Sequence, residues 1–150
     1  MQGAARLLPP LAALFLGGAA SFAAAVDYKS VAVDAAVLFD APSLKAKPVS
    51  ILSRHYPVEV VVVLEGWSKV RDAAGELAWL ESKQLSAKRM LSVRVPRAQA
   101  RAAADEAAPV VFEAEQDVVL ELLETAGNFV RVRHAQGMIG YVRVTQVWGL

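Results

Sequence analysis

The chain has 150 residues, with 16 lysines and arginines against 15 aspartates and glutamates, and it contains no cysteine. A balanced charge argues against nonspecific binding of nucleic acids or other polyanions. The absence of cysteine excludes disulfides, thiolate catalysis and cysteine metal sites. Hydrophobic residues make up 55% of the chain, which is typical of a folded protein rather than a disordered one.

The first 25 residues show the pattern of a secretory signal peptide. One basic residue, Arg6, precedes an uncharged apolar run, and the small residues Ala23 and Ala25 occupy the positions that a signal peptidase reads. We therefore expect cleavage after Ala25 and a periplasmic or secreted protein without net charge. An uncleaved membrane anchor is the alternative, because residues 7–26 are about long enough to span a bilayer core.

The first half of the mature chain reads as a series of short strands. Residues 31–33, 37–39 and 49–52 are β-prone pieces separated by turns, and residues 58–64 are almost all branched aliphatic. The last run predicts the core strand of this half, buried on both sides or nearly so. Residues 68–71 run back with alternating faces, and Gly75 suits a tight hairpin before residues 77–80.

The second half repeats this pattern. The residues around Trp67 and Trp79 return 62 positions later around Phe129 and Tyr141, and further strands are expected at 118–123, 130–133 and 140–144. Upstream, pairing Gly66 with Gly127 gives an offset of 61, so Asn128 is interpreted as an inserted residue. A repeat of about 60 residues predicts two small all-β lobes, packed on each other because a single lobe buries a modest core.

One segment is ambiguous. Residues 98–108 are rich in alanine, and propensity alone favours a helix of about three turns there. The repeat register instead aligns the segment with the irregular residues 37–47. We favour a loop with one helical turn, and the helix stays as the alternative.

These motifs resemble a known family. Gly66-Trp67-Ser68-Lys69-Val70-Arg71, followed by Ala78-Trp79-Leu80, is similar to the signature of bacterial Src-homology-3 domains in their secreted tandem form, and the second copy matches it too. Ala78 and Phe129 depart from it, since the family usually has glycine and tryptophan there. The resemblance implies an all-β fold of two tandem five-stranded β-barrels, with domains at residues 28–90 and 91–150.

The resemblance also implies a non-catalytic module without a cofactor, which binds a cell-wall peptide, a glycan or another envelope protein. The alternative is a structural subunit of an envelope complex, with its aromatic side chains buried at that interface. Neither nucleic acid nor, after cleavage, a membrane is expected as a partner. Enzymatic activity is not expected, because His55 and His134 lack metal-ligand spacing and are interpreted as ordinary surface or turn residues.

Aromatic side chains are the best candidates for a binding groove, because they offer rigid contact area. In the first half, Phe39, Tyr56, Trp67 and Trp79 could line such a groove, and the favoured site there consists of Phe39, Arg54, Tyr56 and Trp67. Its counterparts in the second half are Phe129, Tyr141 and Trp148. The alternative is that Trp67, Trp79 and Tyr141 fill the cores or the space between the lobes.

Overall fold

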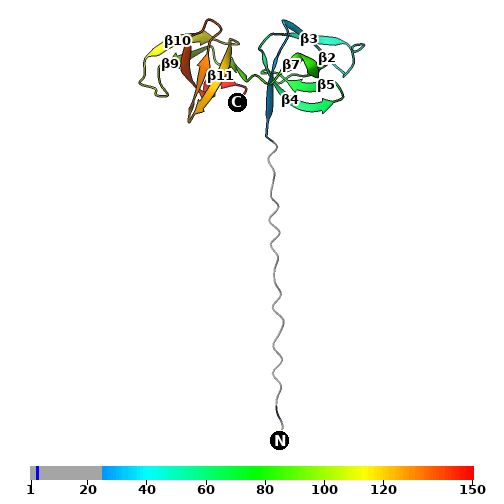
Figure 1. Cartoon of the computed structure of the whole chain (residues 1–150), viewed down its shortest axis with the longest axis horizontal. Coiled ribbons are helices and arrows are strands. Elements are labelled where there is room, and N and C mark those ends of the chain that lie inside the picture. Colours follow the sequence, from blue (N-terminus) through cyan, green and yellow to red (C-terminus); the bar gives the residue numbers. More distant parts are fainter. Residues whose placement is uncertain (1–2, 4–24) are drawn as a thin grey trace.

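The structure is a computed structural model that describes Gly3 and residues 25–150 (Figure 1). The predicted signal peptide at residues 1–25 therefore lies, apart from Gly3 and Ala25, outside the described residues. Within the described part of the chain, no helix is long and apolar enough to cross a membrane.

The described residues form two antiparallel sheets of seven strands each, which we call lobe one and lobe two. Lobe one has the strand order β3-β2-β6-β5-β4-β1-β7, and lobe two has the matching order β10-β9-β13-β12-β11-β8-β14. Lobe one comprises β1 (Asp27–Val31), β2 (Ala35–Phe39), β3 (Pro48–Ser53), β4 (Pro57–Leu64), β5 (Trp67–Arg71), β6 (Leu77–Glu81), the 3₁₀ turn η1 (Ser82–Gln84) and β7 (Leu85–Ser86). Lobe two comprises β8 (Met90–Val93), β9 (Arg97–Arg101), β10 (Val110–Glu115), β11 (Val119–Ala126), β12 (Phe129–Arg133), β13 (Ile139–Arg143), η2 (Val144–Gln146) and β14 (Val147–Trp148).

The all-β tandem architecture is confirmed, but the strands do not close into five-stranded barrels. In lobe one, β2 joins the rest of the sheet only where Phe39 pairs with Trp79. The β2–β3 hairpin is therefore an arm at one edge of the sheet, and β7 lies at the other edge. Each lobe is an open sheet in which the described edge strands do not pair with each other.

The two lobes correspond residue by residue at a constant offset of 62. The Val31 amide donates to the Tyr56 carbonyl in lobe one, and the Val93 amide donates to the Val118 carbonyl in lobe two. The inferred insertion of Asn128 is wrong, because both the β4–β5 and the β11–β12 hairpins have two-residue turns. Each turn needs one residue with positive φ, but Gly66 occupies its second position and Gly127 its first, so aligning the glycines shifts the register by one.

Each lobe has its own apolar core. The core of lobe one gathers residues from five strands: Val31, Ala36, Leu38, Val58, Val70, Ala78 and Leu80. The core of lobe two is larger: Leu91, Val93, Ala98, Ala100, Phe112, Ala114, Leu120, Val130, Val132, Val142 and Val147.

The expectation that residues 58–64 form a fully buried strand is wrong for the second half of β4. Val58 is buried, whereas Val61, Val62, Val63 and Leu64 are exposed. The reason lies in the pairing, because β1 covers β4 only as far as the pair of Asp27 with Val60. Beyond that point β4 continues as a hairpin with β5 alone, and its aliphatic side chains face outward.

The alanine-rich segment is not helical. Its first residues belong to β9, where Ala98 and Ala100 alternate inward to the core of lobe two. Residues 102–109 then form an irregular loop with one hydrogen-bonded turn, in which the Ala108 amide donates to the Asp105 carbonyl at 3.1 Å. Strand alternation thus outweighs the intrinsic helix propensity of alanine here.

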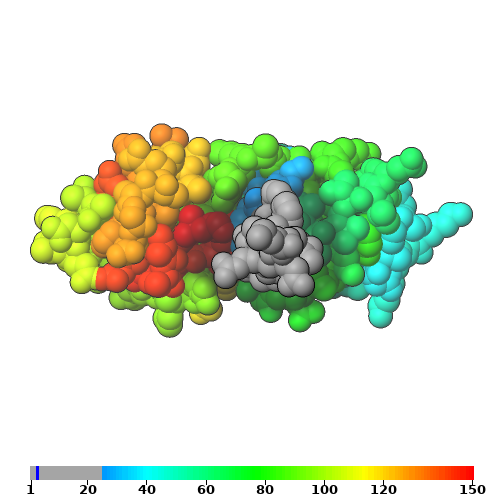
Figure 2. Space-filling model, turned by 90° about the horizontal axis from the view of Figure 1, so that it is seen from below, coloured from blue at the N-terminus to red at the C-terminus, as the bar shows by residue number. Residues whose placement is uncertain are grey.

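The two lobes pack side by side, as expected, and the C-terminal end of the chain lies between them (Figure 2). Tyr28 of β1 and Trp148 of β14 meet edge to face, with ring centroids 5.3 Å apart and planes at 85°. The guanidinium of Arg89 lies 5.5 Å from the Tyr28 ring centroid and donates to the Gly149 carbonyl at 2.8 Å. An aromatic pair and a cation therefore join the two lobes.

Candidate functional site

Lobe one carries a row of aromatic side chains on the outer face of its sheet. Trp67 is paired with Leu64 across the β4–β5 hairpin, and Phe39 is paired with Trp79 across β2 and β6. Directly paired residues in antiparallel strands project to the same side. Lys69 lies two residues after Trp67 and opposite Trp79, so it shares this side too. We call Phe39, Leu64, Trp67, Lys69 and Trp79 the aromatic face.

The side chains of the aromatic face contact one another. The rings of Phe39 and Trp67 meet edge to face with centroids 5.8 Å apart, and the Lys69 ammonium lies 5.9 Å from the Trp79 centroid. All three rings are half-buried. They are thus held in place by packing while one side remains accessible, which is the arrangement of a stacking platform.

A surface cavity adjoins this face. Its volume is about 380 Å³, and Leu38, Val49, Lys69 and Trp79 contribute to its lining. The favoured set of four groove residues leaves out Trp79, although the sequence names it as a possible groove residue. The alternation of residues 67 and 69, together with the cross-strand register, is the signal that would have included it.

The structure does not bring all four predicted groove residues of lobe one together. Ser53 at the end of β3 pairs with Ala35 at the start of β2, whereas Phe39 ends that same strand. Arg54 and Tyr56 follow Ser53 directly. They therefore lie at the opposite end of the β2–β3 hairpin from Phe39.

Arg54 and Tyr56 are each engaged within the protein. The Arg54 Nε donates to an Asp34 carboxylate oxygen at 2.7 Å, and this hydrogen bond and charge lower the pKa of Asp34. Tyr56 packs against the core of lobe one. Burial raises the pKa of Tyr56, the backbone amide of Ala73 opposes that effect, and nearby carboxylates add to it.

The predicted residues of lobe two do not form an equivalent surface. Phe129 is buried beneath the Arg143 guanidinium, 5.6 Å from its ring centroid, and Arg143 forms an ion pair with Glu106. Tyr141 pairs with Arg101, which occupies the place of Phe39. Trp148 lies at the junction with lobe one. The counterpart of the aromatic face is therefore covered and charged.

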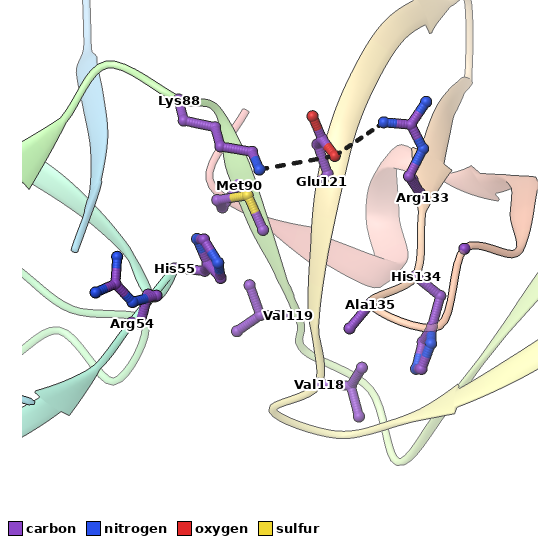
Figure 3. A pocket seen from close by; sticks show the side chains of 11 residues that line it. Arg54, His55, Lys88, Met90, Val118, Val119, Glu121, Arg133, His134 and Ala135 are labelled. Atoms are coloured by element: carbon purple, nitrogen blue, oxygen red, sulfur yellow. Dashed lines mark hydrogen bonds and ion pairs between the residues drawn. The ribbon is translucent and has the colours of Figure 1, made fainter. Parts of the chain in front are cut away.

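A second cavity, of about 510 Å³, lies between the lobes (Figure 3). Both histidines line it, His55 from lobe one and His134 from lobe two. In the sequence they are separated by more than one repeat, and no local motif links them, so only the packing of the lobes reveals their proximity. Among the residues that the structure describes, no group of three histidine or carboxylate side chains is arranged to hold a metal ion.

The solved structures that are similar to this chain include three of low sequence identity. The structure of NlpC1 from Trichomonas vaginalis is 15% identical with a TM-score of 0.39, over 93% of this chain and 51% of that one. NlpC2 from the same organism is 15% identical with a TM-score of 0.38, over 83% and 48%. An NlpC/P60 family protein from Bacillus cereus is 18% identical with a TM-score of 0.38, over 81% and 55%. The chain thus spans about half the length of these proteins.

No curated protein matches the sequence. A family model does match it, twice, at residues 32–87 and 94–149, and these ranges show the same offset of 62 as the strands. The two matches cover most of the chain and include the repeated aromatic, arginine and glycine positions. Together with the paired sheets, they show that the chain belongs to the bacterial SH3 domain family, of which it contains two tandem copies.

Proposed function

We propose that this protein is a non-catalytic binding module that recognises a component of the bacterial cell envelope through the aromatic face of lobe one. The signal-peptide pattern of residues 1–25 supports export to the periplasm or beyond, with domains at residues 28–90 and 91–150. Membership of the bacterial SH3 family supports a binding role rather than a chemical one.

The observation that carries the proposal is the asymmetry between the lobes. Lobe one presents Phe39, Trp67 and Trp79 on one side of its sheet, continued by the exposed Leu64. Lobe two has Arg101, Phe129 and Tyr141 in the aromatic positions and Ala126 in place of Leu64. The fold itself does not require half-exposed tryptophans at positions 67 and 79, because lobe two adopts it with Phe129 and Tyr141 in their place, so the difference favours recognition.

An extended ligand fits this face best. A flat row of rings stacks on peptide groups or on the apolar faces of sugars, and Lys69 adds a cation for a carboxylate. Peptidoglycan, with its peptides and glycan, offers both chemistries. An extended segment of an envelope protein offers the first.

Binding to purified peptidoglycan sacculi tests the proposal. We expect the protein to sediment with sacculi and Trp67→Ala to weaken binding by about thirtyfold, the loss expected for a central aromatic contact. Ile51→Ala is the matched control, because it removes an exposed apolar side chain of β3 outside the aromatic face. Equal sedimentation of the Trp67→Ala variant and the unaltered protein would contradict the role of this face.

The alternative is a structural subunit of an envelope complex that buries the aromatic face against a partner protein. This alternative is favoured if the protein does not bind sacculi and if its tryptophan fluorescence is shielded from a water-soluble quencher only in the native complex. Circular dichroism of Trp67→Ala must show the folded sheet in either experiment.

A further inference from the structure

The cavity between the lobes has the composition of a binding site that is separate from the aromatic face. Its floor is apolar and is formed by Met90, Val118 and Val119, while Lys88, Glu121 and Arg133 lie along one rim (Figure 3). Its volume of about 510 Å³ is in the range of small-ligand pockets. Neither lobe forms it alone, because His55 comes from lobe one and the opposite wall from lobe two.

The charges on the rim are not balanced. One carboxylate oxygen of Glu121 forms ion pairs with both cations, at 3.2 Å from Arg133 Nη1 and 3.9 Å from Lys88 Nζ. One positive charge is therefore left without a counterion from this group. Arg54 does not contribute to the surplus, because its guanidinium is turned away from the cavity toward Asp34.

The cations remain available to a ligand. The side chains of Lys88 and Arg133 are both 45% exposed, and exposed ion pairs of this kind contribute little stability. A ligand carboxylate that entered the rim would restore the charge balance without breaking a strong internal contact.

The histidines add hydrogen-bond donors on two sides of the cavity. The backbone amide of Gln136 donates to His134 Nδ1 at 3.1 Å, so the neutral ring carries its hydrogen on Nε2. His55 has a φ of 71°, and its counterpart Asp117 has a φ of 68°. The fold thus requires a left-handed residue in this turn, and lobe one uses a side chain that points into the cavity where glycine would be less strained.

We propose that this cavity binds the free carboxylate end of a short peptide with small apolar side chains. Arg133 and Lys88 hold the carboxylate, the side chains lie on Met90 and Val119, and the imidazoles donate to peptide carbonyls. The site is distinct from the aromatic face, and its occupation would link the two lobes through one ligand.

Titration of the ¹⁵N-labelled protein with N-acetyl-alanyl-alanine, followed by amide chemical shifts, tests the proposal. We expect shifts at His55, Val119 and Arg133, and an affinity at least about tenfold higher for the free acid than for its C-terminal amide, because a charge-assisted contact is lost in the amide. Arg133→Gln should weaken binding of the free acid by about tenfold or more. The matched control Arg131→Gln removes the same charge from the same strand outside the cavity, and should change affinity less than twofold.

Three results would overturn the proposal. They are equal affinities for the acid and the amide, equal effects of Arg133→Gln and Arg131→Gln, and the same shifts produced by acetate at the same concentration. The His55→Gly variant provides a second check, since it removes the imidazole while favouring the left-handed backbone, and should weaken binding without lowering stability. Trp67→Ala should leave this binding unchanged, which separates the outcome from that of the sacculus experiment.

Discussion

The contact between Tyr28 and Trp148 should couple the stabilities of the two lobes. Trp148→Ala removes the largest side chain at the junction, and truncation of a fully buried tryptophan costs about 3 to 5 kcal/mol. Because Trp148 is only half-buried, we expect a loss of about 2 to 3 kcal/mol in the free energy of unfolding. Of this, the edge-to-face geometry of the pair accounts for about 0.5 to 1.5 kcal/mol.

A double-mutant cycle isolates that pair term. Urea unfolding of the unaltered protein, Tyr28→Ala, Trp148→Ala and the double variant gives the coupling energy, and the contact of Arg89 with Tyr28 cancels because both Tyr28 variants lose it. Trp79→Ala is the control, since Trp79 is also half-buried but lies in the aromatic face, and its coupling to Tyr28→Ala should be near zero. A coupling below about 0.3 kcal/mol for the Tyr28–Trp148 pair would refute the view that this contact joins the lobes.

Three further predictions concern single sites. Gly140→Ala should lower the free energy of unfolding, measured in urea, by about 1 to 3 kcal/mol, because the added Cβ would lie 2.9 Å from the Ala100 Cβ. An unchanged urea midpoint would show instead that the surrounding residues shift to accommodate the Cβ. Arg54 lowers the pKa of Asp34, so the stabilisation from this pair should be present above about pH 4 and disappear as the pH falls through the lowered pKa; a difference between the protein and Asp34→Asn that persists in strong acid would contradict this. Burial raises the pKa of Tyr56, so the contribution of its neutral phenol to stability is present below about pH 10 and is lost as the pH rises through the raised pKa. Tyr56→Phe should therefore reduce the alkaline loss of stability measured by urea unfolding.

The repeat shows which structural features can be predicted from short-range sequence patterns. The alternation around Trp67 and Phe129 predicted the β5–β6 and β12–β13 hairpins, and Gly75 does have the positive φ that a tight turn requires. These features depend on residues close in the chain, whose hydrogen bonding and side-chain direction follow from the period of two. The same reasoning failed for Asn128, because two glycines can satisfy a two-residue turn at different positions.

Other features depended on which strands cover which surfaces. The aliphatic run of β4 predicted a strand but could not show that Val61 to Leu64 extend beyond β1 and are exposed. The alanines of β9 predicted a helix or a loop. In the structure Ala98 and Ala100 lie in a strand and belong to the core of lobe two. In both cases burial is a property of neighbours that are distant in the sequence.

The amino-acid sequence by itself determined the two copies, their all-β character and the family to which they belong, because strand alternation, turn glycines and repeated motifs are encoded locally. Only the tertiary structure decided that Arg54 and Tyr56 lie apart from Phe39, that Trp148 joins the lobes, and that His55 and His134 share a cavity. The physical reason is that contacts between sheets depend on the relative placement of whole lobes, which no periodicity within one lobe specifies.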